Sequence, residues 1–149
     1  MTRGPTRRST CVRVIGIGLV VAVLMSLTAP EGAAQAVGSR PEWGSVSAKG
    51  GVLKASCRDY RYRYEVTAPG DGYWDLSVRL VDPRGKKVWF GYLYDGANPD
   101  AGTATFRLCR SQSVPGVYKL KAVVTVQDFA DAETKGRLKT ARFRLRAQR

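Results

Sequence analysis

The chain has 149 residues, of which 25 are Lys or Arg, 12 are Asp or Glu and none is His. The absence of histidine removes the commonest general base and metal ligand. No serine, thiol or carboxylate spacing marks a nucleophile or an acid–base pair, so we expect no enzyme, no cofactor and no metal site. The net charge of +13 favours polyanionic partners, although solubility alone is the simpler explanation.

Residues 1–36 have the pattern of a secretory signal peptide. An arginine-rich start precedes the uncharged apolar run Val14–Ala29, and Ala34 and Ala36 supply small residues for cleavage. The run is shorter than the ~20 residues that span a bilayer, so cleavage after Ala36 is favoured over a retained membrane anchor. We therefore expect a secreted protein, extracellular or in the cell envelope, with no transmembrane segment after cleavage.

Two cysteines, Cys57 and Cys109, remain once the leader is removed. An even number of cysteines in an exported chain predicts one disulfide bond, because the compartment is oxidising. A bridge that closes a loop of about 50 residues is worth roughly 4 kcal/mol in the chain-entropy model. The bridge would therefore supply a large part of the stability of a small domain.

The chain after the leader begins with a tether or edge strand at residues 37–48, and residues 49–149 are expected to form the domain. Residues Cys57–Thr67 alternate strictly, with Tyr60, Tyr62, Tyr64 and Val66 on one face and charged residues on the other. A tyrosine stripe opposite charges is typical of a core face, so we expect no specific nucleic-acid binding. Further strands are predicted at Tyr73–Val81, Lys87–Tyr94, Thr103–Cys109, Pro115–Asp128 and Leu138–Arg146.

The segments between these strands contain turn-forming residues. Asp82-Pro83-Arg84-Gly85 predicts a tight hairpin turn, and Asp95–Gly102 and Gln127–Gly136 are predicted as loops. Residues Lys87–Tyr94 are apolar on both faces. Either both faces are covered, or Trp89 or Tyr92 is left exposed.

Short strands separated by turns predict an all-β fold, a single antiparallel Greek-key β-sandwich of about seven strands. Residues 115–128 form the longest alternating segment and are expected to be the central strand. Trp74 lies on the third strand, and Pro115-Gly116-Val117-Tyr118 resembles the start of strand F with its corner tyrosine. The chain thus resembles an immunoglobulin-like or fibronectin-III-like domain of a bacterial secreted protein, although strand F carries no cysteine.

The resemblance implies that the second and fifth strands are antiparallel neighbours, with Cys57 and Cys109 at their adjoining ends. The disulfide would then lie within one sheet, and cross-strand pairing would place aromatic against aromatic and acid against base. The implied pairs are Tyr60 with Phe106, Tyr62 with Ala104, and Asp59 with Arg107.

Outward positions of the last two long strands carry a stripe of cations. Such a stripe could bind an anionic polymer with strong salt dependence. The alternative is that the charges protect an exposed sheet edge from aggregation. The candidate polyanion-binding residues are Lys119, Lys121, Arg142, Arg144 and Arg146.

Acidic residues gather in three loops that a sandwich would bring to one end. Oxygen ligands from separate loops suit calcium, but their spacing does not match an EF-hand loop. Asp and Asn are also ordinary turn formers, which we favour as the explanation. The candidate acidic residues are Asp71, Asp95, Asn98, Asp100, Asp128, Asp131 and Glu133.

We therefore expect a secreted, non-enzymatic binding or structural module of the cell envelope that contacts anionic envelope polymers through its basic sheet face. The alternative is an inhibitor-like domain that binds another protein through the loops Asp95–Gly102 and Gln127–Gly136, with Phe129 as an exposed anchor.

Overall fold

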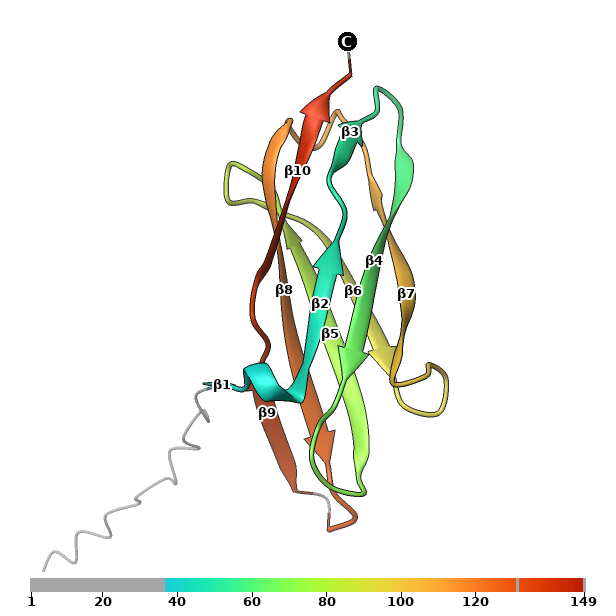
Figure 1. Ribbon diagram of the computed structural model, residues 1–149, viewed down its shortest axis with the longest axis vertical. Coiled ribbons are helices and arrows are strands. Elements are labelled where there is room, and N and C mark those ends of the chain that lie inside the picture. The colour runs from blue at the N-terminus through green and yellow to red at the C-terminus, as the bar shows by residue number, and fades with distance from the viewer. Residues whose placement is uncertain (1–36, 131, 149) are drawn as a thin grey trace, which may run out of the picture. The chain divides into compact units, whose positions relative to one another are not determined.

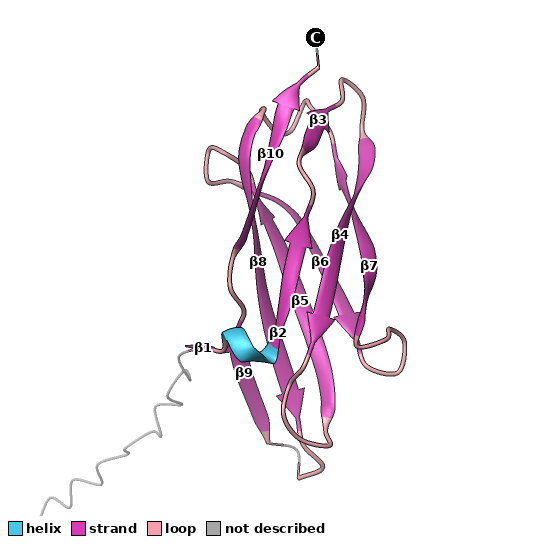
Figure 2. Cartoon of the chain, in the orientation of Figure 1, coloured by secondary structure: helices cyan, strands magenta, loops and turns pink. Residues whose placement is uncertain are grey.

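The strands of the protein form two sheets (Figure 1). The computed structural model describes residues 37–130 and 132–148, so the expected leader, residues 1–36, lies outside the described part of the chain. Within that part, one 3-10 turn, Pro41–Trp43, is the sole helical segment (Figure 2). The smaller sheet contains β2 (Gly44–Ala48), β4 (Arg58–Val66) and β7 (Ala101–Leu108). The larger sheet contains β1 (Gly38–Ser39), β3 (Gly51–Leu53), β5 (Tyr73–Val81), β6 (Lys87–Tyr94), β8 (Gly116–Gln127), β9 (Glu133–Arg137) and β10 (Ala141–Ala147).

Strand β8 is the centre of the larger sheet, as the alternating pattern of residues 115–128 predicts. It pairs with β5 along one edge and with β9 and β10 along the other. Every second side chain of β8 points into the core, because the side chains of a strand alternate between its two faces. The buried residues are Tyr118, Leu120, Ala122, Val124 and Val126.

The prediction of a loop over Gln127–Gly136 is wrong for its second half. Residues Glu133–Arg137 form β9, which makes a hairpin with β8. The inward position of β9 is held by Gly136, which is buried. The strand therefore has no apolar alternation that a sequence pattern could detect.

The start of the strand predicted over Leu138–Arg146 also shifts, because a β-bulge separates β9 from β10. The backbone N–H of Leu138 donates to the carbonyl of Ala122 at 3.0 Å, whereas Ala141 pairs with Leu120. Two residues, 139 and 140, thus lie opposite Lys121 alone, which is the residue count of a bulge. The strand expected from Leu138 begins at Ala141, and Leu138 is buried beside the break.

The N-terminal segment crosses between the sheets. Strand β1 runs parallel to β9, β2 pairs antiparallel with β4, and β3 runs parallel to β10. Trp43 and Val46 in this segment are 7% and 6% exposed, so residues 37–48 contribute to the core as well as to the edge of the smaller sheet. The Trp43 ring covers Gly136, where a Cβ would collide with it.

Strand β6 turns different aromatic side chains to its two faces. Trp89 points inward, with its ring centroid 5.9 Å from that of Tyr62 and 6.0 Å from that of Phe106. Tyr92 points outward and is 63% exposed. Of the two alternatives for this strand, the structure therefore shows the second: one aromatic side chain, that of Tyr92, is left exposed.

The two sheets share one hydrophobic core, and the inward face predicted for residues Cys57–Thr67 is confirmed; the other long strands alternate in the same way. The members that lie furthest from solvent come from facing strands of both sheets, which is how stacked sheets exclude water. The buried positions are Tyr62, Tyr64 and Val66 on β4, Trp74, Leu76, Val78 and Leu80 on β5, Phe106 and Leu108 on β7, and Phe143 and Leu145 on β10; Tyr60, Ala104 and Ala141 are partly buried.

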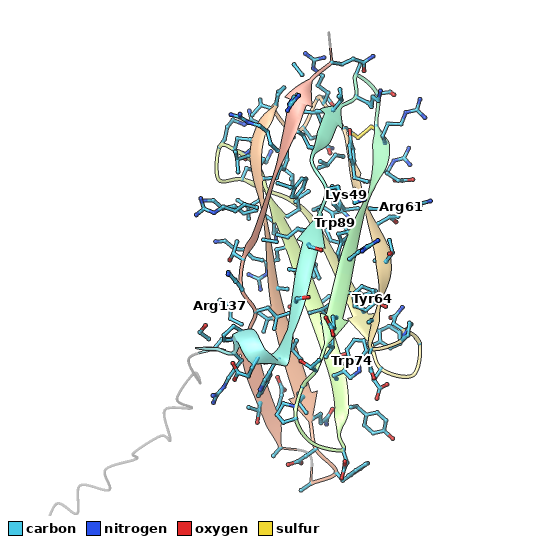
Figure 3. All side chains as sticks on the ribbon, viewed as in Figure 1. Lys49, Arg61, Tyr64, Trp74, Trp89 and Arg137 are labelled. Atoms are coloured by element: carbon cyan, nitrogen blue, oxygen red, sulfur yellow. A yellow bond between two sulfur atoms is a disulfide. The ribbon has the colours of Figure 1, made fainter. Side chains whose placement is uncertain are left out.

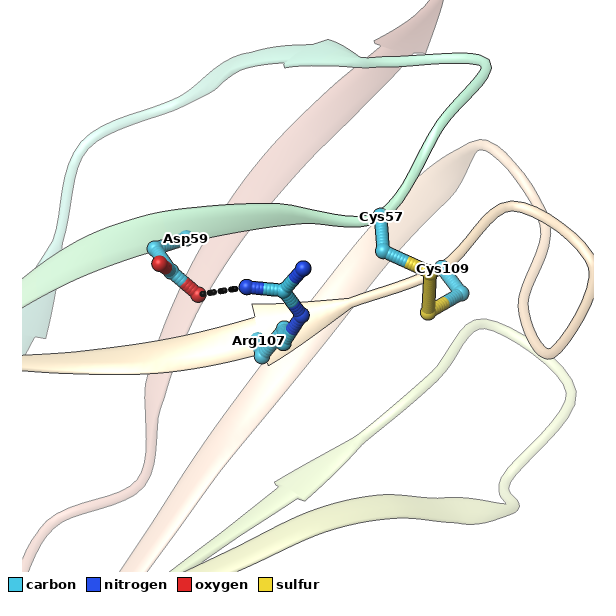
Figure 4. Close-up of a disulfide and its surroundings, with 4 residues drawn as sticks. All are labelled: Cys57, Asp59, Arg107 and Cys109. Carbon is cyan, nitrogen blue, oxygen red and sulfur yellow. Dashed lines mark hydrogen bonds and ion pairs between the residues drawn. A yellow bond between two sulfur atoms is a disulfide. The ribbon is translucent and has the colours of Figure 1, made fainter.

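The disulfide between Cys57 and Cys109 joins β4 and β7 at one end of the smaller sheet (Figure 4). Their Cα atoms are 3.9 Å apart. The ladder that continues from the bridge has the implied register, with Asp59 opposite Arg107 and their charged groups 3.4 Å apart. Tyr60 lies opposite Phe106, and their rings stack with centroids 5.6 Å apart.

A buried carboxylate organises the hairpin turn between β5 and β6. Asp82 is 2% exposed, and its Oδ1 accepts hydrogen bonds from the backbone N–H groups of Arg84 and Lys86, both at 2.9 Å. The Arg84 Nε donates to Oδ2 at 3.2 Å. Burial opposes ionisation, but these donors together hold the pKa of Asp82 below its ordinary value.

Tyr118 is held at the start of β8 by a hydrogen bond to the chain just before the strand. Its Oη donates to the Val114 carbonyl at 2.8 Å and lies 2.6 Å from the Ser113 Oγ. The tyrosine therefore fixes the path by which the chain from β7 enters β8.

Candidate binding face of the larger sheet

The outward face of the larger sheet carries the predicted cations and others that the sequence reasoning did not include, Arg79 among them. Lys119 on β8 lies directly opposite Arg142 on β10, and Lys121 lies opposite Arg79 on β5. We call these residues and their neighbours on β10 the basic face. Its members are Arg79, Lys119, Lys121, Arg142, Arg144 and Arg146.

The five predicted residues share this face but are not all adjacent. Arg144 lies opposite Val117, and Arg146 lies beyond the β8 ladder, beside Val52 of β3. Lys121 lies opposite Arg79 on the β5 side and faces the bulge, which contains the exposed Lys139, on the other side. The alternation of residues 73–81 is enough to place Arg79 on the outward face. Its position beside Lys121, however, follows only from the strand order, which the sequence pattern does not give.

The cations of the basic face have no carboxylate partner among the described residues. The ion pairs in residues 37–130 and 132–148 join Arg40 to Glu42, Arg84 to Asp82, Arg107 to Asp59 and Lys135 to Glu133. Like charges directly opposite one another on a sheet are destabilising. The basic face therefore concentrates uncompensated positive charge.

An aromatic strip on β6 borders the basic face. It consists of Phe90, Tyr92 and Tyr94, which are 38%, 63% and 55% exposed. The Phe90 ring has the Arg79 guanidinium and the Lys87 ammonium group each 5.8 Å from its centroid. Cations at this distance are attracted to the ring face, so charge and aromatic surface are coupled here.

A shallow groove of about 400 Å³ lies between the aromatic strip and β9. Its floor is formed by Ser77, Val123 and Thr125, and Phe90 and Tyr92 line one side. The floor residues are small compared with those on either side, which is why the sheet surface is hollowed there. Figure 3 shows Arg137, at the β9 side, and Arg61, on the smaller sheet, projecting on opposite sides of the molecule.

Three of the predicted acidic residues line one cavity at the other candidate surface. Asp71, Asp95 and Asp100 border a space of about 490 Å³ together with Trp74, whose Nε1 donates to the Asp100 Oδ1 at 2.8 Å. Trp74 lies near the loop between β6 and β7 (Figure 3). That loop ends at Asp100, because Ala101 and Gly102 belong to β7, so the predicted loop Asp95–Gly102 is two residues too long.

The remaining acidic candidates are engaged in their own turns. The Asp128 Oδ1 accepts from the N–H groups of Ala130 and Ala132, both at 2.9 Å, and the Asn98 Oδ1 accepts from the Tyr94 N–H at 3.0 Å. Glu133 lies on β9 and pairs with Lys135, and Asp131 lies outside the described residues. In the described part of the chain, no three His, Cys, Asp or Glu side chains are grouped so as to hold a metal ion.

Comparisons of the chain with protein-family models, curated proteins and solved structures give no match. Among residues 37–130 and 132–148, no helix has the length and apolar composition needed to cross a bilayer.

Proposed function

We propose that the chain is an exported, non-enzymatic β-sandwich module that binds anionic polymers of the cell envelope through its basic face. The fold supports an immunoglobulin-like Greek-key arrangement, because β2, β4 and β7 form one sheet and β5, β6 and β8 belong to the other. The bond from Tyr118 to the Val114 carbonyl is the kind that a corner tyrosine makes in such domains. The disulfide is compatible with an oxidising compartment.

One observation carries the proposal: three cations of the basic face lie on the central strands β5 and β8. Protection of an edge from aggregation would require charges on edge strands. Arg79 lies on β5 and Lys119 and Lys121 lie on β8, and both strands have partners on each side. Edge protection therefore does not account for these three cations, whereas a polyanion laid across the sheet would neutralise them.

Binding to immobilised heparin at two salt concentrations tests this function. Replacing Arg79, Lys119 and Lys121 together by Ser should weaken binding by ~10-fold or more, because the variant neutralises fewer charges of the polymer and so releases fewer of its counterions. The salt dependence of binding should become shallower in the same variant. A second triple variant, with Arg142, Arg144 and Arg146 replaced by Ser, should behave likewise.

The control variant removes the same charge from the other sheet. Lys49, Arg61 and Arg63 are exposed on or beside β2 and β4, and their replacement by Ser should change the affinity by less than about 2-fold if the basic face is the site. An equal loss of heparin binding in this control would mean that net charge alone is responsible. Parental affinity in both basic-face variants would refute the proposal.

A second candidate function, protein binding through the loops, is favoured by the position of Phe129. This residue is 75% exposed in the β8–β9 turn, and its ring packs against Tyr73 with centroids 6.1 Å apart. The bonds accepted by Asp128 order this turn, so the aromatic anchor would lose little entropy on binding. Capture of a single protein from envelope extract that is lost in Phe129→Ala, and is insensitive to salt, would support this alternative.

A further inference from the structure

The groove beside the basic face combines an accessible aromatic ring with groups that recognise hydroxyls. Tyr92, Ser77 and Val123 lie in one row across three strands, and the next row places Asp75 beside Thr125. Ser77 and Val123 are small, so the ring of Tyr92 stands above the groove floor with one side open to solvent. Binding sites for organic molecules commonly pair aromatic surface with a few placed polar groups in this way.

The orientation of Tyr92 is set before any ligand arrives. Its ring meets Phe90 edge to face, with centroids 4.6 Å apart and an interplanar angle of 84°. Phe90 is itself flanked by Arg79 and Lys87. A ring fixed by its neighbours loses little conformational entropy when it binds, which favours a stacking role for Tyr92.

Asp75 distinguishes the groove from the rest of the basic face. It is exposed, lies opposite Tyr94 and Thr125, and has no ion-pair partner among the described residues. A ligand with a negative charge on every unit would be repelled there, whereas a ligand with hydroxyl groups would donate to its carboxylate. Arg79 is two residues further along β5, on the same face. The groove thus offers an acceptor for hydroxyls and a cation for an acidic group within one stretch of strand.

We propose that the ligand of this face is an acidic polysaccharide. One sugar ring stacks its C–H face on Tyr92, its hydroxyls bond to Asp75 and Thr125, and an acidic group of the same or the next sugar meets Arg79 and Lys121. This assignment rests on the proposed polyanion-binding function and adds that the polymer must carry sugar rings. Single-stranded nucleic acid has rings and charge as well, but Asp75 disfavours its regular phosphates.

The test compares three polymers: hyaluronan, in which sugars with a carboxylate alternate with uncharged sugars; poly-glutamate, which has carboxylates and no rings; and oligo-deoxythymidine. Affinities are measured by calorimetry for the parent protein and for Tyr92→Ser. The matched control is Tyr73→Ser, because Tyr73 is also 63% exposed and lies on β5 of the same sheet, outside the groove. Tyr92→Phe tests whether the ring itself is what matters. The melting temperature of each variant verifies that it is folded.

The expected result is that Tyr92→Ser weakens hyaluronan binding by ~5-fold or more, because the sugar loses the aromatic surface on which it stacks, and changes poly-glutamate binding by less than about 2-fold, because that polymer has no ring to stack. Tyr73→Ser and Tyr92→Phe should resemble the parent. If Tyr92→Ser weakens neither polymer while the Arg142, Arg144 and Arg146 variant weakens both, the polysaccharide assignment is wrong and the polyanion function stands. If that charge variant weakens neither, the polyanion function fails as well. Tighter, Tyr92-dependent binding of oligo-deoxythymidine would overturn the assignment in favour of nucleic acid.

Discussion

Asp82 offers the most direct test of the structural reasoning, because its carboxylate is wholly enclosed and carries three hydrogen bonds. Replacement by Ala removes the acceptor of the Arg84 and Lys86 backbone N–H groups and of the Arg84 side chain. Hydrogen bonds to a charged group contribute ~1.5–3 kcal/mol each, but Arg84 and Lys86 are exposed and their donors can bond to water in the variant, so we expect a total loss of about 3 kcal/mol in the free energy of unfolding. Urea denaturation of the parent and the variant at neutral pH measures this loss.

Because Asp82 is charged, the free energy of unfolding should also depend on pH, and the direction of this dependence follows from the pKa of Asp82. The folded state holds the pKa below the ordinary value of 3.8, so the unfolded state takes up a proton first as the pH falls. The stabilisation by the ionised carboxylate is therefore complete above about pH 5 and is lost as the pH falls through the folded pKa.

Asp82→Asn isolates this charge-dependent part, because the amide oxygen can still accept from the two backbone N–H groups. We expect the parent to be more stable than the variant by ~1–2 kcal/mol at neutral pH, and the difference to shrink below about pH 4. A difference that is constant from about pH 7 to about pH 2.5 would refute the reasoning, since it would mean that the carboxylate titrates alike in both states.

Three further predictions concern stability. Replacing Cys57 and Cys109 together by Ala should lower the free energy of unfolding by roughly 4 kcal/mol, as measured by urea denaturation, because the bridge spans 52 residues; an unchanged midpoint would contradict it. Gly91→Ala should cost ~1–3 kcal/mol, because a Cβ there overlaps the tryptophan ring packed over it, whereas Gly38→Ala, with open space around its Cα, should be neutral in the same assay. Burial raises the pKa of Tyr62 to about 12, so its contribution to stability is present below about pH 10 and is lost as the pH rises towards 12; Tyr62→Phe should shift alkaline unfolding, followed by circular dichroism, to higher pH.

The parts of the fold that the sequence predicts are those with a strong local pattern. Alternation with a period of two fixes which residues of β4, β5, β7 and β8 face the core, because one face of each strand must exclude water. The register between β4 and β7 followed from the positions of Cys57 and Cys109 together with an assumed strand order. Its pairs, such as Tyr60 with Phe106, are found in the structure.

Strand β9 shows why other elements escape prediction. Its residues, Glu133–Arg137, include no large apolar side chain, and its inward position is a glycine covered by Trp43 from a segment some 90 residues earlier in the chain. The strand exists because β8 offers it an unpaired edge and β1 covers its far side. Both partners are distant or weakly patterned, so no local rule identifies it.

The sequence by itself determined that the chain is all-β, which faces of the long strands are buried, and that Lys119, Lys121, Arg142, Arg144 and Arg146 point away from the core. The tertiary structure decided which of these cations are neighbours. It brought Arg79 beside Lys121, placed the aromatic strip of β6 along the same face, and left a groove between that strip and β9. The physical reason is that alternation depends on each strand alone, whereas a binding face is composed across strands whose order is set by long-range pairing.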